Sequence, residues 1–268
     1  MIFKAYKMDG LGNDFLIIDK RKVKVDLNEK DIQKLSNRKN GIGFDQLIYI
    51  EKKNLDLEVK YFNSNGRFAD ACGNGNRCVA KFLMDETKKN TVRFYVGKKV
   101  HDAKLISEKI VSISMGKVNY NLEKIPVSNE VDTNPLKIKL KDFCEEGHLI
   151  NIGNPHIIFL RDISDQDFEN IGPQIENHKY FPNGINVTFV NLSNDNDIKI
   201  KTWERGAGKT LSCGTAACVT GHLLIKKKLA NNPVKINFLL GSIEIKNNLE
   251  EIIMTGPVSD IKKINVKI

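Results

Sequence analysis

Two cysteines in this 268-residue chain stand where a thiol could act on a substrate. Cys72 and Cys213 are each followed by glycine and then by small and apolar residues with helical spacing, so each is predicted to begin a helix. The N–H groups and positive dipole at a helix N-terminus favour a thiolate and can also bind a carboxylate. If the two cysteines face one substrate carbon, one thiolate can remove a proton while the other thiol delivers one to the opposite face. The pattern therefore predicts inversion of a carbon centre without a cofactor.

The remaining cysteines, Cys78, Cys144 and Cys218, are interpreted as structural. Five is an odd number, no CxxC pair occurs, and structural zinc sites usually take ligands two to four residues apart, so neither a disulfide framework nor a metal site is predicted. For any single cysteine, packing in the core is the plainer interpretation. It is the pair of Cys-Gly helix starts that favours thiol chemistry.

Other polar residues indicate a site for a zwitterionic small molecule. Five asparagines fall in predicted loops or at strand ends, although any one of them could simply form a turn: Asn13, Asn63, Asn74, Asn154 and Asn186. His156 is either a hydrogen-bonded core residue or a neighbour that tunes a cysteine. Glu204 and Arg205 follow the segment IKIKTW and precede Cys213 by nine and eight residues. This spacing suggests an acid and a carboxylate-binding residue at the same opening of the substrate site; the alternative is an ion pair on the surface.

The elements that must position these groups are mostly strands. Alternating apolar residues recur along the whole chain, and helical spacing is convincing only at 29–35, 75–84, 165–175 and 214–229. The two Cys-Gly pairs lie 141 residues apart (213 − 72), about half the chain. This spacing predicts an α+β fold of two similar domains, residues 1–117 and 118–256, each a sheet around a central helix that begins at a Cys-Gly pair.

Composition limits the other function classes. The net charge is +9, but 35 of the 42 basic residues are lysine and most are scattered, whereas bidentate recognition of phosphate or guanine favours arginine, so no nucleic-acid partner is predicted. The glycine-rich segments at 10–15 and 204–210 lack glycines that nucleotide-binding loops require, which disfavours a nucleotide cofactor. Apolar runs are far shorter than the ~20 residues of a membrane span, and the start has no secretory signal, so we expect a cytoplasmic protein without a membrane partner.

Taken together, these segments resemble the diaminopimelate epimerase family. The resemblance rests on segments that occur in the family's order over both halves: KMDGLGNDF at 7–15, Asp45-Gln46, CGNGNRC at 72–78, GNPH at 153–156, NVTFV at 186–190 and WERGAGKTLSCGTAAC at 203–218. It implies an enzyme that interconverts LL- and meso-diaminopimelate without a cofactor, for lysine and peptidoglycan-precursor synthesis. It also implies two similar domains, each with a mixed, mostly antiparallel sheet or barrel wrapped around a central helix. The active site would lie in the cleft between them, and the last strand, at about 257–268, would return to the first domain.

The resemblance also implies a role for each matched residue. Cys72 and Cys213 correspond to the two catalytic bases, and His156 and Glu204 to residues that assist deprotonation of Cys72 and Cys213 respectively. The family's contacts with the small-molecule substrate correspond to Asn13, Gln46, Asn63, Gly73, Asn74, Asn154, Asn186, Glu204, Arg205, Gly214 and Thr215. No metal is implied, and the resemblance allows a homodimer.

The chain departs from the family at a few positions. The loop that usually reads Asn-x-Asp-Gly-Ser-Glu is NSNGRF here, at residues 63–68, and Lys209 and Ala216 replace an acid and a glycine. None of these departures is a matched substrate contact. A racemase for another amino acid, a thiol redox or small-ligand-binding protein, and a nucleic-acid binder remain as alternatives; the matched set that favours diaminopimelate is Asn63, Asn154, Asn186 and Arg205.

Overall fold

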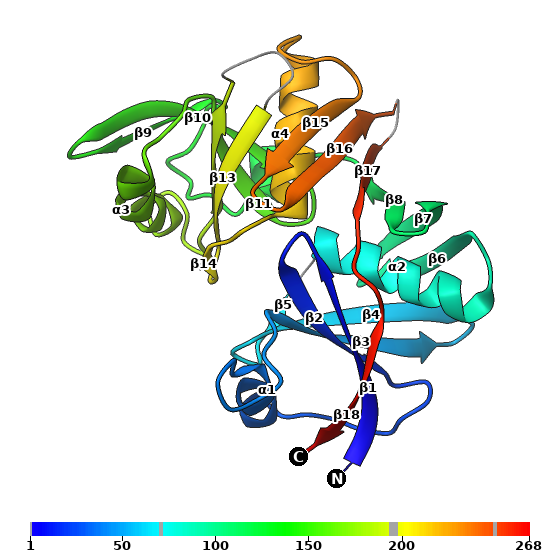
Figure 1. The fold of residues 1–268 in the computed structure, drawn as a ribbon. Helices are drawn as coiled ribbons and strands as arrows, with labels where there is room; N and C mark the ends of the chain where they lie inside the picture. Colours follow the sequence, from blue (N-terminus) through cyan, green and yellow to red (C-terminus); the bar gives the residue numbers. More distant parts are fainter. Residues whose placement is uncertain (1, 70–71, 193–197, 249–250) are drawn as a thin grey trace. The chain divides into compact units, whose positions relative to one another are not determined.

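The computed structural model describes residues 2–69, 72–192, 198–248 and 251–268 (Figure 1). The chain divides into two compact units. Unit 1 comprises Met1–Ser114 and Thr255–Ile268, and unit 2 comprises Met115–Met254. Among the described residues, no helix combines the length and the apolar character that crossing a membrane requires.

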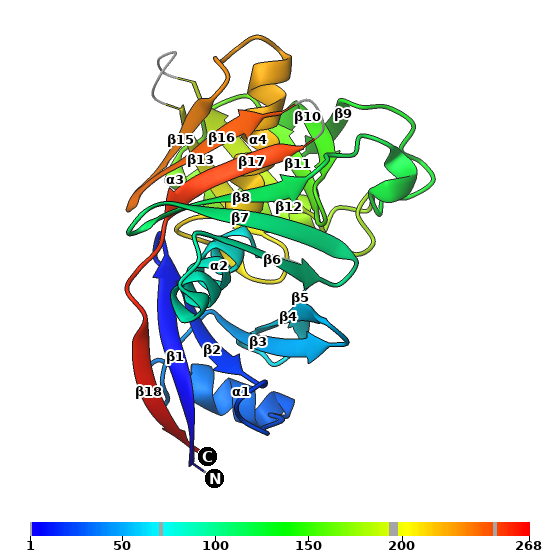
Figure 2. The same ribbon diagram turned by 90° about the vertical axis from the view of Figure 1, so that its right-hand side faces the viewer.

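Unit 1 is a twisted sheet with one helix on each face (Figures 1 and 2). Its strands are β1 (Ile2–Gly10), β2 (Asn13–Asp19), β3 (Gln46–Lys53), β4 (Asp56–Asn63), β5 (Phe68–Ala69), β6 (Thr91–Val96), β7 (Lys99–Ser107), β8 (Ile110–Gly116), β17 (Ile252–Pro257) and β18 (Lys262–Lys267), of which β8 and β17 run across the unit boundary. The pairings β2–β3 and β4–β6 are parallel, and β18–β1, β1–β2, β3–β4, β4–β5, β6–β7 and β7–β8 are antiparallel. The final strand β18 therefore lies beside β1.

The two helices of unit 1 cover different sets of apolar side chains. Helix α1 (Glu29–Ser36) buries Ile32 and Leu35 in a cluster with Leu16 and Ile18 of β2. Helix α2 (Gly73–Thr87) packs against β1, β2, β6 and β7. Because side chains alternate between the faces of a strand, β2 supplies both helices with buried residues.

Unit 2 repeats this plan. Its elements are the 3₁₀ helix Leu122–Lys124, β9 (Leu136–Leu140), β10 (Phe143–Asn151), β11 (Pro155–Phe159), α3 (Asp165–Glu176), β12 (Asn186–Asn191), β13 (Ile198–Glu204), β14 (Gly208–Lys209), α4 (Gly214–Lys226), β15 (Val234–Phe238) and β16 (Gly241–Asn247). The parallel pairs are β11–β12 and β13–β15, which correspond to β2–β3 and β4–β6 of unit 1. Helix α3 follows β11 as α1 follows β2, and α4 follows β14 as α2 follows β5.

The predicted α+β fold with two repeated halves is confirmed by this plan. All four predicted helices exist. Helix α4 ends at Lys226 rather than near residue 229, because Lys228 adopts a positive φ of 59° and the amide of Leu229 turns back to bond the carbonyl of Leu224.

The structural interpretation of the other cysteines holds for two of the three. Cys78 and Cys218 are fully buried on α2 and α4. Cys144, in contrast, is exposed, because it alternates with the buried Phe143 at the start of β10 and so lies on the outer face of that strand.

Candidate active site

In unit 1, three predicted substrate contacts lie at one edge of the sheet. Asn13 and Gln46 begin the parallel strands β2 and β3, and Asn63 ends the antiparallel strand β4. Gln46 stands directly opposite Asn63 and donates from Nε2 to its Oδ1 at 2.9 Å. The other end of this amide, Gln46 Oε1, is buried and has no hydrogen-bond partner, so it can accept a hydrogen bond from a ligand.

Cys72 is the N-cap residue of α2, with extended backbone angles (φ −144°, ψ 108°). The backbone amide of Gly75 donates to its Sγ at 3.4 Å, and the thiol is placed to donate to Oδ1 of Asn13 at 3.5 Å. The helix's own hydrogen-bond ladder begins where the amide of Asn76 donates to the carbonyl of Cys72. The sulfur therefore lies in the first turn of a helix, where amide groups favour negative charge.

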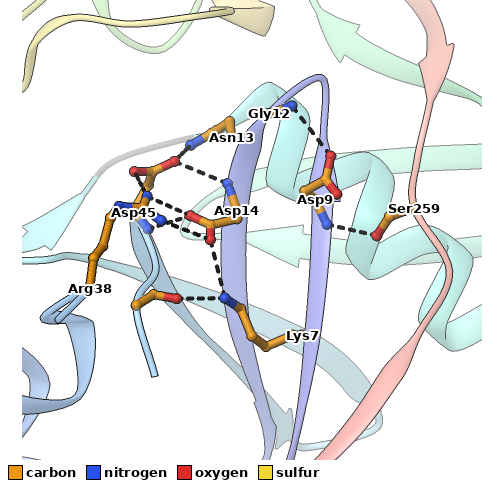
Figure 3. Close-up of polar contacts among 9 residues, drawn as sticks. Lys7, Asp9, Gly12, Asn13, Asp14, Arg38, Asp45 and Ser259 are labelled. Atoms are coloured by element: carbon orange, nitrogen blue, oxygen red, sulfur yellow. Dashed lines mark hydrogen bonds and ion pairs between the residues drawn. The ribbon is translucent and has the colours of Figure 1, made fainter. Parts of the chain in front are cut away.

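Asn13 is hydrogen-bonded to a cluster of charged side chains (Figure 3). Its Nδ2 donates to Oδ2 of Asp45 at 3.0 Å, and the same oxygen accepts the backbone amide of Asp14 at 3.0 Å. Arg38 donates to both carboxylates, to Asp45 at 2.6 Å and to Asp14 at 2.9 Å. Burial would raise the pKa of Asp14, but the cations of Arg38 and Lys7 hold it below its usual value. The sequence indicates Asp45 only as part of a matched segment, whereas the structure shows that it holds Asn13, a predicted substrate contact.

Sequence reasoning also missed Arg77 on α2. This side chain is completely buried, which is rare for arginine. Its guanidinium donates to Oδ1 of Asn74 at 3.0 Å and to the carbonyl of Pro257 at 3.4 Å. A Cβ at Gly256 would stand 3.1 Å from its Cζ, so glycine leaves the space that the guanidinium occupies. Arg77 therefore fixes Asn74, a predicted substrate contact in the first turn of α2.

In unit 2, a chain of hydrogen bonds joins four predicted site residues. Cys213 is the N-cap residue of α4, and its Sγ lies 3.4 Å from Oγ1 of Thr215. Asn154 donates to the same Thr215 oxygen at 3.2 Å, and its Oδ1 lies 3.1 Å from Nε2 of His156. Because that oxygen can only accept, Nε2 carries the proton of the ring.

His156 is neutral in this arrangement. It is fully buried, and burial, assisted by the positive charge of Arg205, lowers its pKa to about 3. With Nε2 protonated, Nδ1 is an acceptor, and it is buried with no hydrogen-bond partner. The resemblance pairs His156 with Cys72, whereas the hydrogen bonds inside unit 2 lead from it towards Cys213; its action on Cys72 stays a prediction.

Cys213 is more buried than Cys72 and lies near a carboxylate. Burial, followed by the negative charge of Glu204, raises the pKa of the Cys213 thiol well above its usual value, while the Thr215 hydroxyl and the Ala216 amide offset part of this effect. Glu204 accepts a hydrogen bond from Thr210 Oγ1 at 2.7 Å, which fixes the carboxylate at the end of β13. Cys213 is therefore a thiol at neutral pH, with a carboxylate beside it that can hold its proton.

Asn186 and Arg205 complete this edge of unit 2. Asn186 stands beside His156 in the parallel pair β11–β12. Its amide spans two backbone groups, since Nδ2 donates to the carbonyl of Pro155 at 2.8 Å and Oδ1 accepts the amide of Arg205 at 3.0 Å. The stem of Arg205 lies over Gly184, where φ is +70° and a Cβ would stand 3.1 Å from its Cγ.

The sequence model of the diaminopimelate epimerase family matches residues 5–121 and 148–261. The chain belongs to the diaminopimelate epimerase family. Two relatives described as diaminopimelate epimerase are similar over nearly their whole length. The one from Pelagibacter ubique (strain HTCC1062) is 45% identical, with 100% of both chains covered. The one from Zymomonas mobilis (strain ATCC 31821 / ZM4 / CP4) is 37% identical, with 98% of this chain and 97% of the relative covered.

Solved structures share the fold at low sequence identity. A hydroxyproline epimerase from Agrobacterium vitis has a TM-score of 0.73 at 10% identity and covers 99% of this chain and 91% of its own. A probable proline racemase from Agrobacterium radiobacter K84 has a TM-score of 0.72 at 11% identity and covers 100% and 93%. At this identity the likeness concerns the fold alone.

In this member of the diaminopimelate epimerase family, every predicted site residue lies within the described part of the chain. Unit 1 holds Cys72, Gly73, Asn74, Asn13, Gln46 and Asn63, and unit 2 holds Cys213, Gly214, Thr215, Asn154, His156, Asn186, Glu204 and Arg205. Within each unit the cysteine begins a helix and amide side chains occupy strand ends. Among the described residues, no group of three or more His, Cys, Asp or Glu side chains is arranged to hold a metal ion.

Proposed function

We propose that this protein interconverts LL-2,6-diaminopimelate and meso-diaminopimelate, with Cys72 and Cys213 as the two bases. The observation that carries the proposal is the full-length family match together with a cysteine at the N-cap of the corresponding helix in each half. The amides and alkyl surroundings of these positions are suited to a reaction that moves a proton and passes through a carbanion.

The proposed reaction conserves protons and electrons. One cysteine, as thiolate, takes the α-proton and becomes a thiol, and the electron pair of the broken C–H bond stays on the α-carbon. The other cysteine, as thiol, gives its proton to the opposite face and becomes a thiolate. The centre is thereby inverted, and the reverse reaction exchanges the two roles. No external oxidant, reductant or cofactor enters this balance.

The complex with substrate must supply one thiolate. Cys213 is buried beside Glu204, which can accept its proton once a substrate ammonium or carboxylate changes the local charge. Substrate carboxylate at the first turn of a helix would be stabilised by the amides of Gly73 and Asn74 or of Gly214 and Thr215. The amide groups of Gln46, Asn63, Asn154 and Asn186 are proposed to recognise the amino-acid end that does not react.

Exchange of the substrate α-proton in deuterated water tests the proposal. Purified protein with LL-diaminopimelate should incorporate deuterium at the α-carbon and produce the meso form. Cys72→Ser and Cys213→Ser should each reduce epimerisation by at least about 10³-fold, because a serine hydroxyl is a far weaker acid than a thiol and supplies almost no alkoxide base at neutral pH. Unchanged thermal unfolding of both variants is the control for folding.

Two outcomes would overturn the proposal. A protein that exchanges no α-proton with any diaminopimelate isomer is not this epimerase. Full activity in either serine variant would remove the assignment of that cysteine, and reversible disulfide chemistry without isomerisation would point to a redox function.

A further inference from the structure

The amide of Asn13 has a fixed orientation. One end of an asparagine side chain donates and the other accepts, while a carboxylate only accepts. The end that faces Asp45 is therefore Nδ2, at 3.0 Å from Oδ2, and the end that faces Cys72 is Oδ1, at 3.5 Å from Sγ. An oxygen at this position accepts a hydrogen bond from a thiol and repels a thiolate.

The carboxylate that sets this orientation is itself held on both oxygens (Figure 3). Oδ2 of Asp45 also accepts the backbone amide of Asp14, and Oδ1 accepts from Arg38 at 2.6 Å. In return, the amide of Asp45 donates to the side chain and the carbonyl of Asp14, both at 3.0 Å. These reciprocal bonds tie the segment before β3 to the start of β2, so Asp45 cannot rotate away from Asn13 without losing several partners.

We propose that Asp45 is a positioning residue that keeps the oxygen of Asn13 turned towards Cys72, so that Cys72 rests as the proton-bearing thiol. The inference rests on the proposed function, because it gives Cys72 the role of proton donor in the resting enzyme. Cys72 delivers its proton to the substrate carbon, and the thiolate that forms faces the Asn13 oxygen and is favoured to take a proton back. Asp45 touches neither the thiol nor the substrate and acts only through Asn13.

Several groups around Cys72 bear on its charge. Tyr61 of β4 and Cys78 of α2 interact electrostatically with it, and burial raises the pKa of both, so both are neutral at pH 7. On α2, the cation of Arg77 favours negative charge at Cys78, and the Gly75 amide donates to Cys72 Sγ. These groups favour the thiolate or leave it unaffected, whereas the Asn13 oxygen is a contact that favours the thiol.

Asp45→Asn tests this orientation with almost no change in shape. If the NH₂ group of the new side chain takes the place of Oδ2, it gives up the bond from the Asp14 backbone amide and donates to Oδ1 of Asn13 instead, which allows Asn13 to turn its own NH₂ group towards the sulfur. We expect alkylation of Cys72 by iodoacetamide at pH 7 to become about tenfold faster, since replacing an acceptor by a donor favours the thiolate. Peptide mass spectrometry follows each cysteine, and the exposed Cys144 of unit 2 is the internal reference. The kcat of epimerisation should fall more than KM changes.

Asp14→Asn is the matched control. It removes the same charge from the same cluster but leaves the bond between Asp45 and Asn13 in place. We expect it to change the Cys72 to Cys144 alkylation ratio less than twofold. An equal rise in both variants would show that charge alone is responsible, and no rise in Asp45→Asn would show a merely structural role; either result overturns the proposal.

Two further variants keep the test decisive if Asp45→Asn unfolds. Asn13→Ala removes the oxygen directly and should accelerate alkylation of Cys72, whereas Asp45→Glu keeps an acceptor and should not. The alkylation ratio requires no substrate, so it stands apart from the epimerase assay. A wild-type protein without epimerase activity overturns the proposed function, and unchanged alkylation in Asn13→Ala overturns the role of Asp45.

Discussion

Gly75 controls how closely α2 approaches the sheet of unit 1. A Cβ at this position would stand 2.7 Å from Cε1 of Tyr61 and 3.2 Å from Cδ1 of Ile48. Carbon atoms in contact lie about 3.5–4.0 Å apart, so Gly75→Ala requires a displacement of about 1 Å. Tyr61 cannot easily supply it, because its hydroxyl donates to Oδ1 of Asn76 at 2.5 Å and its ring is completely buried. The helix must move instead.

Two opposing effects set the size of the change in stability. Alanine in place of glycine within a helix stabilises it by about 1 kcal/mol. Overpacking a close-packed core costs about 1–3 kcal/mol. We therefore expect Gly75→Ala to lower the free energy of unfolding by up to about 2 kcal/mol. The effect on activity should be larger, because the Gly75 amide contacts Cys72 Sγ and a displacement of about 1 Å near reacting groups can cost about 10²-fold in kcat/KM.

Urea unfolding and epimerisation kinetics measure the two effects. A double-mutant cycle with Tyr61→Leu identifies the cause, since removal of the ring edge relieves the overlap and Gly75→Ala should then cost at least about 1 kcal/mol less. Wild-type stability and kcat/KM in Gly75→Ala would refute the argument. A loss of stability that does not depend on residue 61 would also refute it, because the overlap with Tyr61 would not be its source.

Two further predictions concern buried charge. The pKa of His156 is about 3 in the folded protein and about 6.5 when unfolded, so between these values the unfolded chain binds an extra proton. The contribution of neutral His156 to stability is complete above about pH 6.5 and declines as the pH falls towards 3. The free energy of unfolding should therefore fall by about 2–3 kcal/mol between pH 7 and pH 4.5 on account of this residue. Urea titrations over this pH range should show a smaller fall in His156→Gln. Arg77→Met leaves the buried acceptors on Asn74 and Pro257 without the guanidinium, so it should lower the free energy of unfolding by about 2–4 kcal/mol. The exposed Arg93→Met is the control and should cost much less; equal losses in a calorimetric comparison would contradict the prediction.

Periodicity was sufficient to predict the elements and the repeat. Strands and helices with one buried face can be recognised from the spacing of their apolar residues. Cys72 and Cys213 each stand one residue before the start of a helix. Residues at strand ends were also open to prediction, because Asn13, Gln46 and Asn186 each begin a strand.

The groups that hold these residues in place were not predictable in the same way. Asp45 meets Asn13 across 32 residues of sequence, through two loops whose path no local pattern specifies. An arginine on an amphipathic helix is normally solvated, and the burial of Arg77 depends on a strand that enters unit 1 only near the end of the chain. The exposure of Cys144 likewise depended on the register of β10, where a shift of one residue reverses the face.

The two halves share a scaffold but differ in charge at corresponding positions. Asn63 ends β4 in unit 1, and Glu204 ends the corresponding strand β13 in unit 2. A neutral amide thus stands where the other half has a carboxylate, and that carboxylate, Glu204, acts electrostatically on Cys213 and can take the proton of its thiol. Since two identical thiol environments would hold their protons equally, this difference favours Cys213 as the base, with Glu204 taking its proton, and Cys72 as the acid. A duplicated fold can supply two cysteines at equivalent positions of its halves, and unequal neighbours are what allow them to differ in protonation.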